Sequence, residues 1–340
     1  KLVLGYTVEG FKEKDNGVEV LLKDNPSLQA DMVVLAIGVT PDTVLAKEAG
    51  LELGIKESIV VNDRMETSVP DIYAAGDAVQ VKHYVTGNDA LISLAGPANK
   101  QGRIIADNIC GGDSRYLGSQ GSSVIKVFDM TAATTGINET NAQKSGLEVD
   151  TVILSPMSHA GYYPGGKVMT MKVIFEKESY RLLGAQIIGY EGVDKRIDVL
   201  ATAIHAGLNA TQLKDLDLAY APPYSSAKDP VNMAGFMIDN IAKGTLKQWH
   251  LEDMDKISKD KDVVLLDVRT VGEFSRGHID GFKNIPVDEL RERISEIEKG
   301  KPVYLICQSG LRSYIASRIL EGNGLSLIHI SEPTRPEPIS

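Results

Sequence analysis

The chain has 340 residues, of which 43% are hydrophobic and 24% charged, so it is long enough for two or three globular domains. Its formal net charge of −10 disfavours a general nucleic-acid surface and attraction to anionic membranes, and no apolar run approaches the ~20 residues of a spanning helix. Only two cysteines are present, Cys110 and Cys307, which fits a reducing cytoplasm and leaves too few thiols for a cysteine-rich zinc site. We therefore expect a cytoplasmic protein with no nucleic-acid, membrane or metal partner.

The first 119 residues alternate strand-like and helix-like segments. Asp15-Asn16-Gly17 is typical of a tight turn between two strands, and the apolar run 31–37 is typical of a buried strand. A helix that Pro97 can start ends at Gly111-Gly112. We expect strands at 1–9, 17–22, 31–37, 59–61 and 71–75, and helices at 43–50 and 96–109.

Residues 120–243 show longer strands followed by helices, with Thr211 as the expected N-cap of a short helix. This order favours an α+β unit, an antiparallel sheet with helices on one face. The expected strands are 123–129, 151–155, 167–176 and 181–188, and the expected helices are 193–206, 211–217 and 229–243.

The sequence pattern changes again after an expected linker at 244–249. Residues 250–324 give an α/β pattern with strands at 263–268 and 303–306, each followed by a helix. The tail from Leu325 to Arg335 reads like the translation of a sequencing adapter, so we expect residues 325–340 to stand outside the fold. Together with the absence of a start methionine, this predicts a fragment cut at both ends.

The most informative motif in the first part is Thr67-Ser-Val-Pro-Asp-Ile-Tyr-Ala-Ala-Gly-Asp-Ala-Val79. It resembles the second flavin motif of the FAD-dependent pyridine nucleotide-disulfide oxidoreductases. The resemblance implies that Asp77 accepts a hydrogen bond from the flavin's ribityl chain. The helix near Gly96 would stabilise negative charge on the reduced ring. Gly76, Asp77 and Ala95 are the expected cofactor-binding residues, and the glycine-rich nucleotide fingerprints and the redox cysteine are expected upstream. Cys110, at a helix end, is expected to be a small buried hydrophobe.

Two tyrosine motifs follow, Ser158-His-Ala-Gly-Tyr-Tyr-Pro-Gly165 and Asp217-Leu-Ala-Tyr-Ala-Pro-Pro-Tyr-Ser-Ser226. Phenols on loops braced by proline and glycine can donate protons to a leaving thiolate. Both motifs resemble the coenzyme A-disulfide reductase branch, in which two tyrosines of the dimerisation domain assist catalysis. Tyr162 and Tyr220 match them, with Tyr163 and Tyr224 as near neighbours. Packing at a dimer interface is the alternative. Asp194, Lys195 and Arg196 are expected on a solvated or interface face.

The C-terminal part contains Asp267-Val-Arg269, Gly277-His-Ile-Asp-Gly281 and Cys307-Gln-Ser-Gly-Leu-Arg312. In this order the three motifs resemble a rhodanese domain. Cys307 ends a strand before a helix N-terminus, where backbone N–H groups and Arg312 would favour a thiolate and cradle a persulfide. We therefore expect Cys307 to be a second, appended centre.

The combined expectation is an α/β and α+β chain that belongs to an FAD-dependent, NAD(P)H-using reductase of coenzyme A disulfide, persulfide or polysulfide, fused to rhodanese and assembled as a homodimer. The alternatives are an NADH oxidase or peroxidase of the same superfamily, and a sulfur-carrier module on a flavoprotein scaffold. The expected domains are the end of an NAD(P)-binding domain (1–42), part of an FAD-binding domain with a Rossmann-like fold (43–119), a dimerisation domain (120–243), a linker (244–249) and a truncated rhodanese-like domain (250–324).

Overall fold

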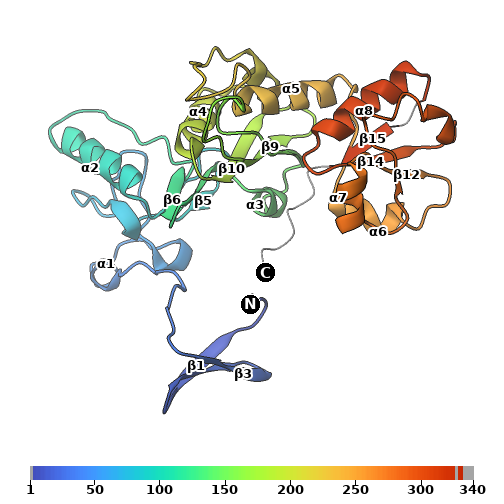
Figure 1. Ribbon diagram of the computed structural model, residues 1–340. Coiled ribbons are helices and arrows are strands. Elements are labelled where there is room, and N and C mark those ends of the chain that lie inside the picture. Colours follow the sequence, from blue (N-terminus) through green and yellow to red (C-terminus); the bar gives the residue numbers. More distant parts are fainter. Residues whose placement is uncertain (1–2, 326–327, 332–340) are drawn as a thin grey trace.

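The computed structural model describes residues 3–325 and 328–331. Figure 1 shows a small N-terminal sheet in blue, set apart from the rest, and a central and a C-terminal unit that lie side by side. Among the helices of these residues, none has both the length and the apolar character needed to cross a membrane.

The N-terminal sheet is an antiparallel meander in the order β1-β2-β3. Gly17 closes the turn with φ +141°, and a Cβ there would lie 2.5 Å from the Ala30 carbonyl oxygen, so only glycine fits. The expected strand at 31–37 is wrong, because this segment forms no strand and Ile37 is 89% exposed. Its apolar run resembles a buried strand, but periodicity alone does not show which surface covers it. The strands are β1 (Val8–Lys14), β2 (Gly17–Leu22) and β3 (Asn25–Ala30).

The next region packs a few short elements against one long helix. Met65, Val79 and Val81 form its small buried core. The expected strands 59–61 and 71–75 are reduced to isolated bridges, in which Ile59 pairs with Val79 and Tyr73 with Glu66. The elements are α1 (Val44–Glu48), two single 3-10 turns (Ile55–Glu57 and Gly76–Ala78), β4 (Val81–Lys82), β5 (Asp89–Ala90) and α2 (Ala95–Ile109).

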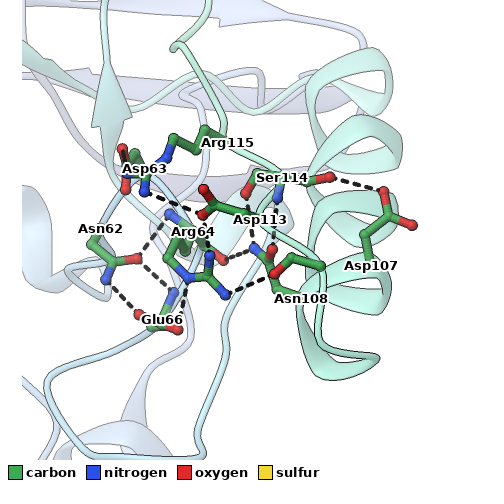
Figure 2. Close-up of polar contacts among 10 residues, drawn as sticks. Asn62, Asp63, Arg64, Glu66, Asp107, Asn108, Asp113, Ser114 and Arg115 are labelled. Atoms are coloured by element: carbon green, nitrogen blue, oxygen red, sulfur yellow. Dashed lines mark hydrogen bonds and ion pairs between the residues drawn. The ribbon is translucent and has the colours of Figure 1, made fainter.

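A polar cluster fixes the C-terminal end of α2 (Figure 2). The buried Asn108 side chain donates to the carbonyl oxygens of Arg64 and Ser114, at 3.1 and 2.9 Å, and accepts from the Ser114 amide at 2.8 Å. Arg64 also forms ion pairs with Glu66 and Asp113. Cys110, which caps the helix, is exposed, so the expectation of a buried hydrophobe is wrong. The preceding residue, Ile109, is also 64% exposed, so this side of the helix end faces solvent although Asn108 is buried.

The central unit is a five-stranded antiparallel sheet in the order β6-β7-β10-β9-β8, with α4 and α5 packed against it and against each other. Gly184 permits a close crossing, because a Cβ there would lie 2.0 Å from the Ile137 carbonyl oxygen. The expected N-cap Thr211 is wrong. The N-cap is Asn209, two residues before Thr211, and its side chain accepts a hydrogen bond from the Thr211 amide. Asn and Thr are both common N-cap residues, so the sequence alone did not separate them. The elements are β6 (Ser123–Val127), β7 (Met130–Gly136), α3 (Glu139–Lys144), β8 (Val149–Leu154), β9 (Thr170–Glu176), β10 (Leu182–Gly189), α4 (Val193–His205), a 3-10 helix (Ala210–Asp215) and α5 (Pro230–Ala242).

The C-terminal unit is a parallel sheet in the order β11-β15-β14-β12-β13. Its elements are β11 (Gln248–Trp249), a 3-10 turn (Leu251–Asp253), α6 (Met254–Ile257), β12 (Val264–Asp267), α7 (Val271–Arg276), β13 (Lys283–Asn284), a 3-10 turn (Ile294–Glu296), β14 (Val303–Ile306), α8 (Leu311–Gly322) and β15 (Ile328–Ser331).

Two of the expected domain boundaries cut through this sheet. The expected linker 244–249 contains β11, and Trp249 is buried and donates to the Leu305 carbonyl oxygen at 3.2 Å. Part of the excluded tail forms β15, whose Ile328 and Ile330 are buried between β11 and β14. Alternating apolar residues favour a strand whether the segment comes from a natural gene or from an adapter. The strand therefore does not test the adapter hypothesis, which stays a prediction. Residues 326–327 and 332–340 lie outside the described part of the chain.

Candidate functional site

The first candidate site lies where the 3-10 turn that carries Gly76 and Asp77 packs against α2. Gly76 has φ +81°, and its amide donates to the Gln101 side chain at 2.8 Å, so the turn is tied to the helix. Asp77 keeps its carboxylate exposed at this turn. The turn therefore offers a hydrogen-bond acceptor to a hydroxyl group.

Helix α2 starts at Ala95, one residue before the expected start, and no side chain caps its N-terminus. A helix of this length concentrates partial positive charge on its first amides, which stay available to an electron-rich ligand. The uncapped start of α2 and the turn with the exposed Asp77 carboxylate, which packs against α2, are the two features expected of a flavin site. Gly76, Asp77 and Ala95 are therefore placed in one small region.

The second candidate site is the tyrosine pair, defined as Tyr162 and Tyr220. Their hydroxyl oxygens lie 2.6 Å apart, although 58 residues separate them in sequence. Both side chains remain exposed, by 76% and 44%. The hydrogen bond to Tyr162 raises the pKa of the Tyr220 phenol above its usual value. Two protonated phenols that share one hydrogen bond retain one O–H, which can donate to a third group.

The neighbouring tyrosines do not join the pair. Tyr163 packs edge-on against His159, with ring centroids 5.6 Å apart. The Tyr224 ring is 72% exposed, and its backbone carbonyl accepts from Arg196. The geometry therefore separates the two tyrosines matched by spacing from their near neighbours.

A cavity of about 640 Å³ opens beside Tyr220. Its charged lining residues are Glu191, Lys195 and Arg196, and the remainder comes from Gly192 and the two tyrosine loops. In the described part of the chain, no group of three or more His, Cys, Asp or Glu could hold a metal ion.

Arg196 is the residue that sequence reasoning misplaced. It is 1% exposed, which does not suit the expected solvated face. Asp194 is exposed and Lys195 is half-buried. The signal was present in the sequence, because position 196 falls on the same helical face as Val193 and Leu200, which are buried. A charged residue on an apolar helix face needs a buried partner, and Asp229 supplies it at 3.0 Å.

The third candidate site is the Cys307 loop, defined as residues 307–312, between β14 and α8. Cys307 is fully buried, and its Sγ accepts hydrogen bonds from the Gly310 and Ser313 amides at 3.1 and 3.3 Å. Amide donors around sulfur can stabilise a thiolate by charge-assisted hydrogen bonds. Backbone amides therefore surround the sulfur at the start of α8, and the binding of a persulfide there stays a prediction.

Arg312, the expected donor to the sulfur substrate, is paired with a carboxylate in this structure. Its two terminal nitrogens donate to the two carboxylate oxygens of Glu273, each at 2.7 Å. This guanidinium holds the pKa of the Glu273 carboxyl well below its usual range. Glu273 sits in the first turn of α7, where Thr270 also binds it. Sequence reasoning missed Glu273 as the partner of Arg312.

The other two C-terminal motifs are joined by a hydrogen bond, in which Arg269, just after β12, donates to the Gly277 carbonyl oxygen at 2.9 Å. Asp267 is buried and paired with Arg269 at 2.6 Å. The Asn284 amide donates to the carbonyl oxygens of Asp267 and Arg269, at 3.0 and 2.8 Å. These bonds fix the loop that leads to Glu273.

Three stretches of the chain match known protein families. Residues 1–102 match the family model for pyridine nucleotide-disulphide oxidoreductase, residues 122–230 match its dimerisation domain, and residues 250–331 match the rhodanese-like domain. The NAD(P)H sulfur oxidoreductase (CoA-dependent) of Pyrococcus furiosus is 38% identical over 214 residues, which cover 63% of this chain and 48% of that protein.

Two solved structures resemble almost the whole chain. Reduced Bacillus anthracis CoADR-RHD has a TM-score of 0.90 and 46% identity, covering 96% of this chain and 58% of its own. An NAD-dependent persulfide reductase from A. fulgidus has a TM-score of 0.87 and 41% identity, covering 96% of this chain and 59% of its own. The chain therefore spans about half the length of the curated relatives it matches.

Proposed function

Because the chain belongs to the pyridine nucleotide-disulphide oxidoreductase family and carries a rhodanese-like domain, we propose that the complete protein is an FAD-dependent NAD(P)H reductase of coenzyme A disulfide, persulfide or polysulfide. The rhodanese-like domain would act as a sulfurtransferase that supplies it. The observation that carries the proposal is the hydroxyl–hydroxyl contact of 2.6 Å between Tyr162 and Tyr220.

FAD, when bound, supplies the electron transfer from nicotinamide to the disulfide substrate. Asp77 would hold a flavin hydroxyl, and the uncapped start of α2 at Ala95 would face electron-rich atoms of the ring. The φ of +81° at Gly76 and its bond to Gln101 keep the turn against the helix.

The tyrosine pair would act on the leaving sulfur. Two-electron reduction of a disulfide breaks the S–S bond and releases two thiolates, and each leaving thiolate needs a proton or a hydrogen-bond donor. The pair keeps one O–H available, and a phenol whose pKa lies above the usual value of about 10 is protonated near neutral pH. Reduction of oxygen or peroxide releases no thiolate, so the pair favours a disulfide reductase over an NADH oxidase or peroxidase.

The same proposal includes assembly and location. A homodimer would form through residues 120–240 and bring each tyrosine pair to the partner's flavin, because the matched region includes a dimerisation domain. Thiol chemistry of this kind suits a reducing compartment such as the cytoplasm.

The test is Tyr220→Phe in the complete protein, with the two half-reactions measured separately by stopped-flow absorbance. Removing the hydroxyl should slow oxidation of the reduced enzyme by coenzyme A disulfide by about 100-fold. Reduction of the flavin by NADH should be unchanged, because that step releases no thiolate.

The matched control is Tyr163→Phe, which removes a hydroxyl from the neighbouring residue outside the pair. It should leave both half-reactions at the wild-type rate. Equal slowing of both half-reactions by Tyr220→Phe would point to packing and sink the proton-donor role.

A further inference from the structure

Arg196 links the two loops that carry the tyrosine pair. Its Nη2 atom lies 3.0 Å from the Ser158 carbonyl oxygen, in the loop of Tyr162. The same nitrogen lies 3.3 Å from the Tyr224 carbonyl oxygen and 3.2 Å from Ser225 Oγ, in the loop of Tyr220. A single guanidinium nitrogen therefore touches both loops from inside the domain.

Asp229 fixes this guanidinium. Its carboxylate accepts from Arg196 Nη2 at 3.0 Å and from Nε at 3.2 Å, and both side chains are buried. Asp229 also caps α5, so the ion pair is anchored to a helix start. On the other side, Nη1 donates to the Gly192 carbonyl oxygen at 3.1 Å. A Cβ at Gly192 would lie 1.9 Å from Nη1, so the space is closed around the guanidinium.

Burial does not hold the tyrosine pair together. Tyr162 and Tyr220 are exposed, and ordering two exposed side chains costs conformational entropy. The loop backbones also meet directly, through a hydrogen bond from the Ala160 amide to the Ser225 carbonyl oxygen at 2.9 Å. The separation of the loops, and with it the contact of the phenols, depends on what fixes the loop backbones.

We propose that Arg196 is a positioning residue, which holds the loops of Tyr162 and Tyr220 at the separation where the two phenols hydrogen-bond. The inference rests on the proposed function of the pair for its catalytic consequence, but not for its structural one. A side chain that merely neutralised Asp229 would need only the carboxylate contact. Arg196 also contacts three main-chain carbonyls through two nitrogens, Gly192 through Nη1 and both Ser158 and Tyr224 through Nη2.

The test is Arg196→Lys in the complete protein. Lysine keeps a positive charge beside Asp229, but its ammonium is compact and lacks the planar fork that reaches both loops. The first readout needs no turnover: the ionisation of Tyr220, obtained as the ultraviolet difference titration between each protein and its Tyr220→Phe derivative. We expect the raised pKa of Tyr220 to fall back toward the usual value for tyrosine in Arg196→Lys.

The second readout is a double-mutant cycle on thiolate release. Arg196→Lys should slow oxidation of the reduced enzyme by coenzyme A disulfide by about tenfold or more and spare reduction of the flavin. In a Tyr162→Phe/Tyr220→Phe background the same substitution should change the rate by less than about twofold. Equal slowing in both backgrounds would mean that Arg196 does not act through the pair.

Gly192→Ala is the second perturbation, because its Cβ displaces the guanidinium without removing a charge. Lys214→Met is the matched control. It breaks the ion pair of 2.6 Å with Asp239 on the same helix α5, away from both loops, and should leave the Tyr220 titration unchanged. The result is read from Arg196→Lys or Gly192→Ala, whichever keeps the wild-type melting temperature.

A wild-type Tyr220 titration in that variant would overturn the inference. Failure of the proposed function gives a different result: Tyr220→Phe would turn over normally while Arg196→Lys still changed the Tyr220 titration.

Discussion

Glu273 and Arg312 form a two-pronged ion pair beside the Cys307 loop, with 2.7 Å between each nitrogen and its oxygen. The pair is partly shielded, since 18% of the Glu273 side chain and 26% of the Arg312 side chain are exposed. It joins α7 to the start of α8, so it braces the loop that surrounds the thiol. In the resting protein the guanidinium is therefore held by a carboxylate, and an anionic sulfur donor would have to compete with Glu273.

The ion pair predicts a pH-dependent stability for the C-terminal unit. The Glu273 carboxyl has a pKa lowered from 4.5, so its stabilisation is fully present above that value and is lost as pH falls toward the lowered pKa. Glu273→Gln should lower the free energy of unfolding by roughly 1 kcal/mol at pH 7, and the difference from wild type should shrink below about pH 4.

Urea unfolding followed by fluorescence measures this directly, because Trp249 is the single tryptophan and is buried in this unit. Glu292→Gln serves as the control, since among the described residues its exposed side chain has no ion-pair partner. A difference between wild type and Glu273→Gln that stayed constant down to pH 3 would contradict the assignment to this carboxylate.

At the scale of elements, helices and sheets of the central unit followed from periodicity, because α4, α5 and strands β8 to β10 each have a buried face. The prediction failed where an element lacks a partner close in sequence. The segment 31–37 has the composition of a strand without a neighbouring strand, and β11 is too short to show a period.

The candidate sites followed the same rule. The sequence pointed to Tyr162, Tyr220 and Cys307, since each sits in a local motif of turn residues or at a strand end, and their catalytic roles stay predictions. It did not show the partners that come from distant elements: Asp229 for Arg196 and Glu273 for Arg312 are 33 and 39 residues away. Long-range pairs of charged residues leave no local pattern in a single sequence.

The junction of β14 with α8 carries its own prediction. In the complete protein Cys307→Ser should abolish sulfur transfer from thiosulfate to cyanide, because serine does not accept the sulfane sulfur that the thiolate takes up with release of sulfite. Reduction of free coenzyme A persulfide should be largely retained. Cys110→Ser, which changes the exposed cysteine at the end of α2, is the control and should leave both activities intact.

Loss of every flavin-dependent reduction in Cys307→Ser would place this thiol in the main electron path. Flavin content of the purified complete protein separates the remaining alternative: a sulfur carrier on a scaffold would need no bound flavin, whereas a reductase holds it stoichiometrically.

For the whole molecule, the central sheet presents an uncovered edge. Strand β6 pairs only with β7 among the described strands, and its apolar side chains Val124, Ile125 and Val127 are more than half exposed. Phe128, in the turn after it, is 93% exposed. An apolar strand at a sheet edge invites pairing or burial by another chain, and this one lies in the region matched to a dimerisation domain.

We therefore expect Phe128→Asp to weaken the proposed homodimer without unfolding the subunit. Phe128 has φ 52°, a conformation that aspartate adopts more readily than phenylalanine, so the substitution removes apolar surface and adds charge with little backbone cost. Light scattering after size-exclusion chromatography should show a shift toward monomer that grows on dilution, with turnover falling in parallel because each tyrosine pair would lose its partner flavin. Leu117→Asp changes an apolar residue that is 70% exposed and lies outside 120–240, and it should leave the mass unchanged. A dimer of undiminished affinity in Phe128→Asp would show that the subunits meet through another face.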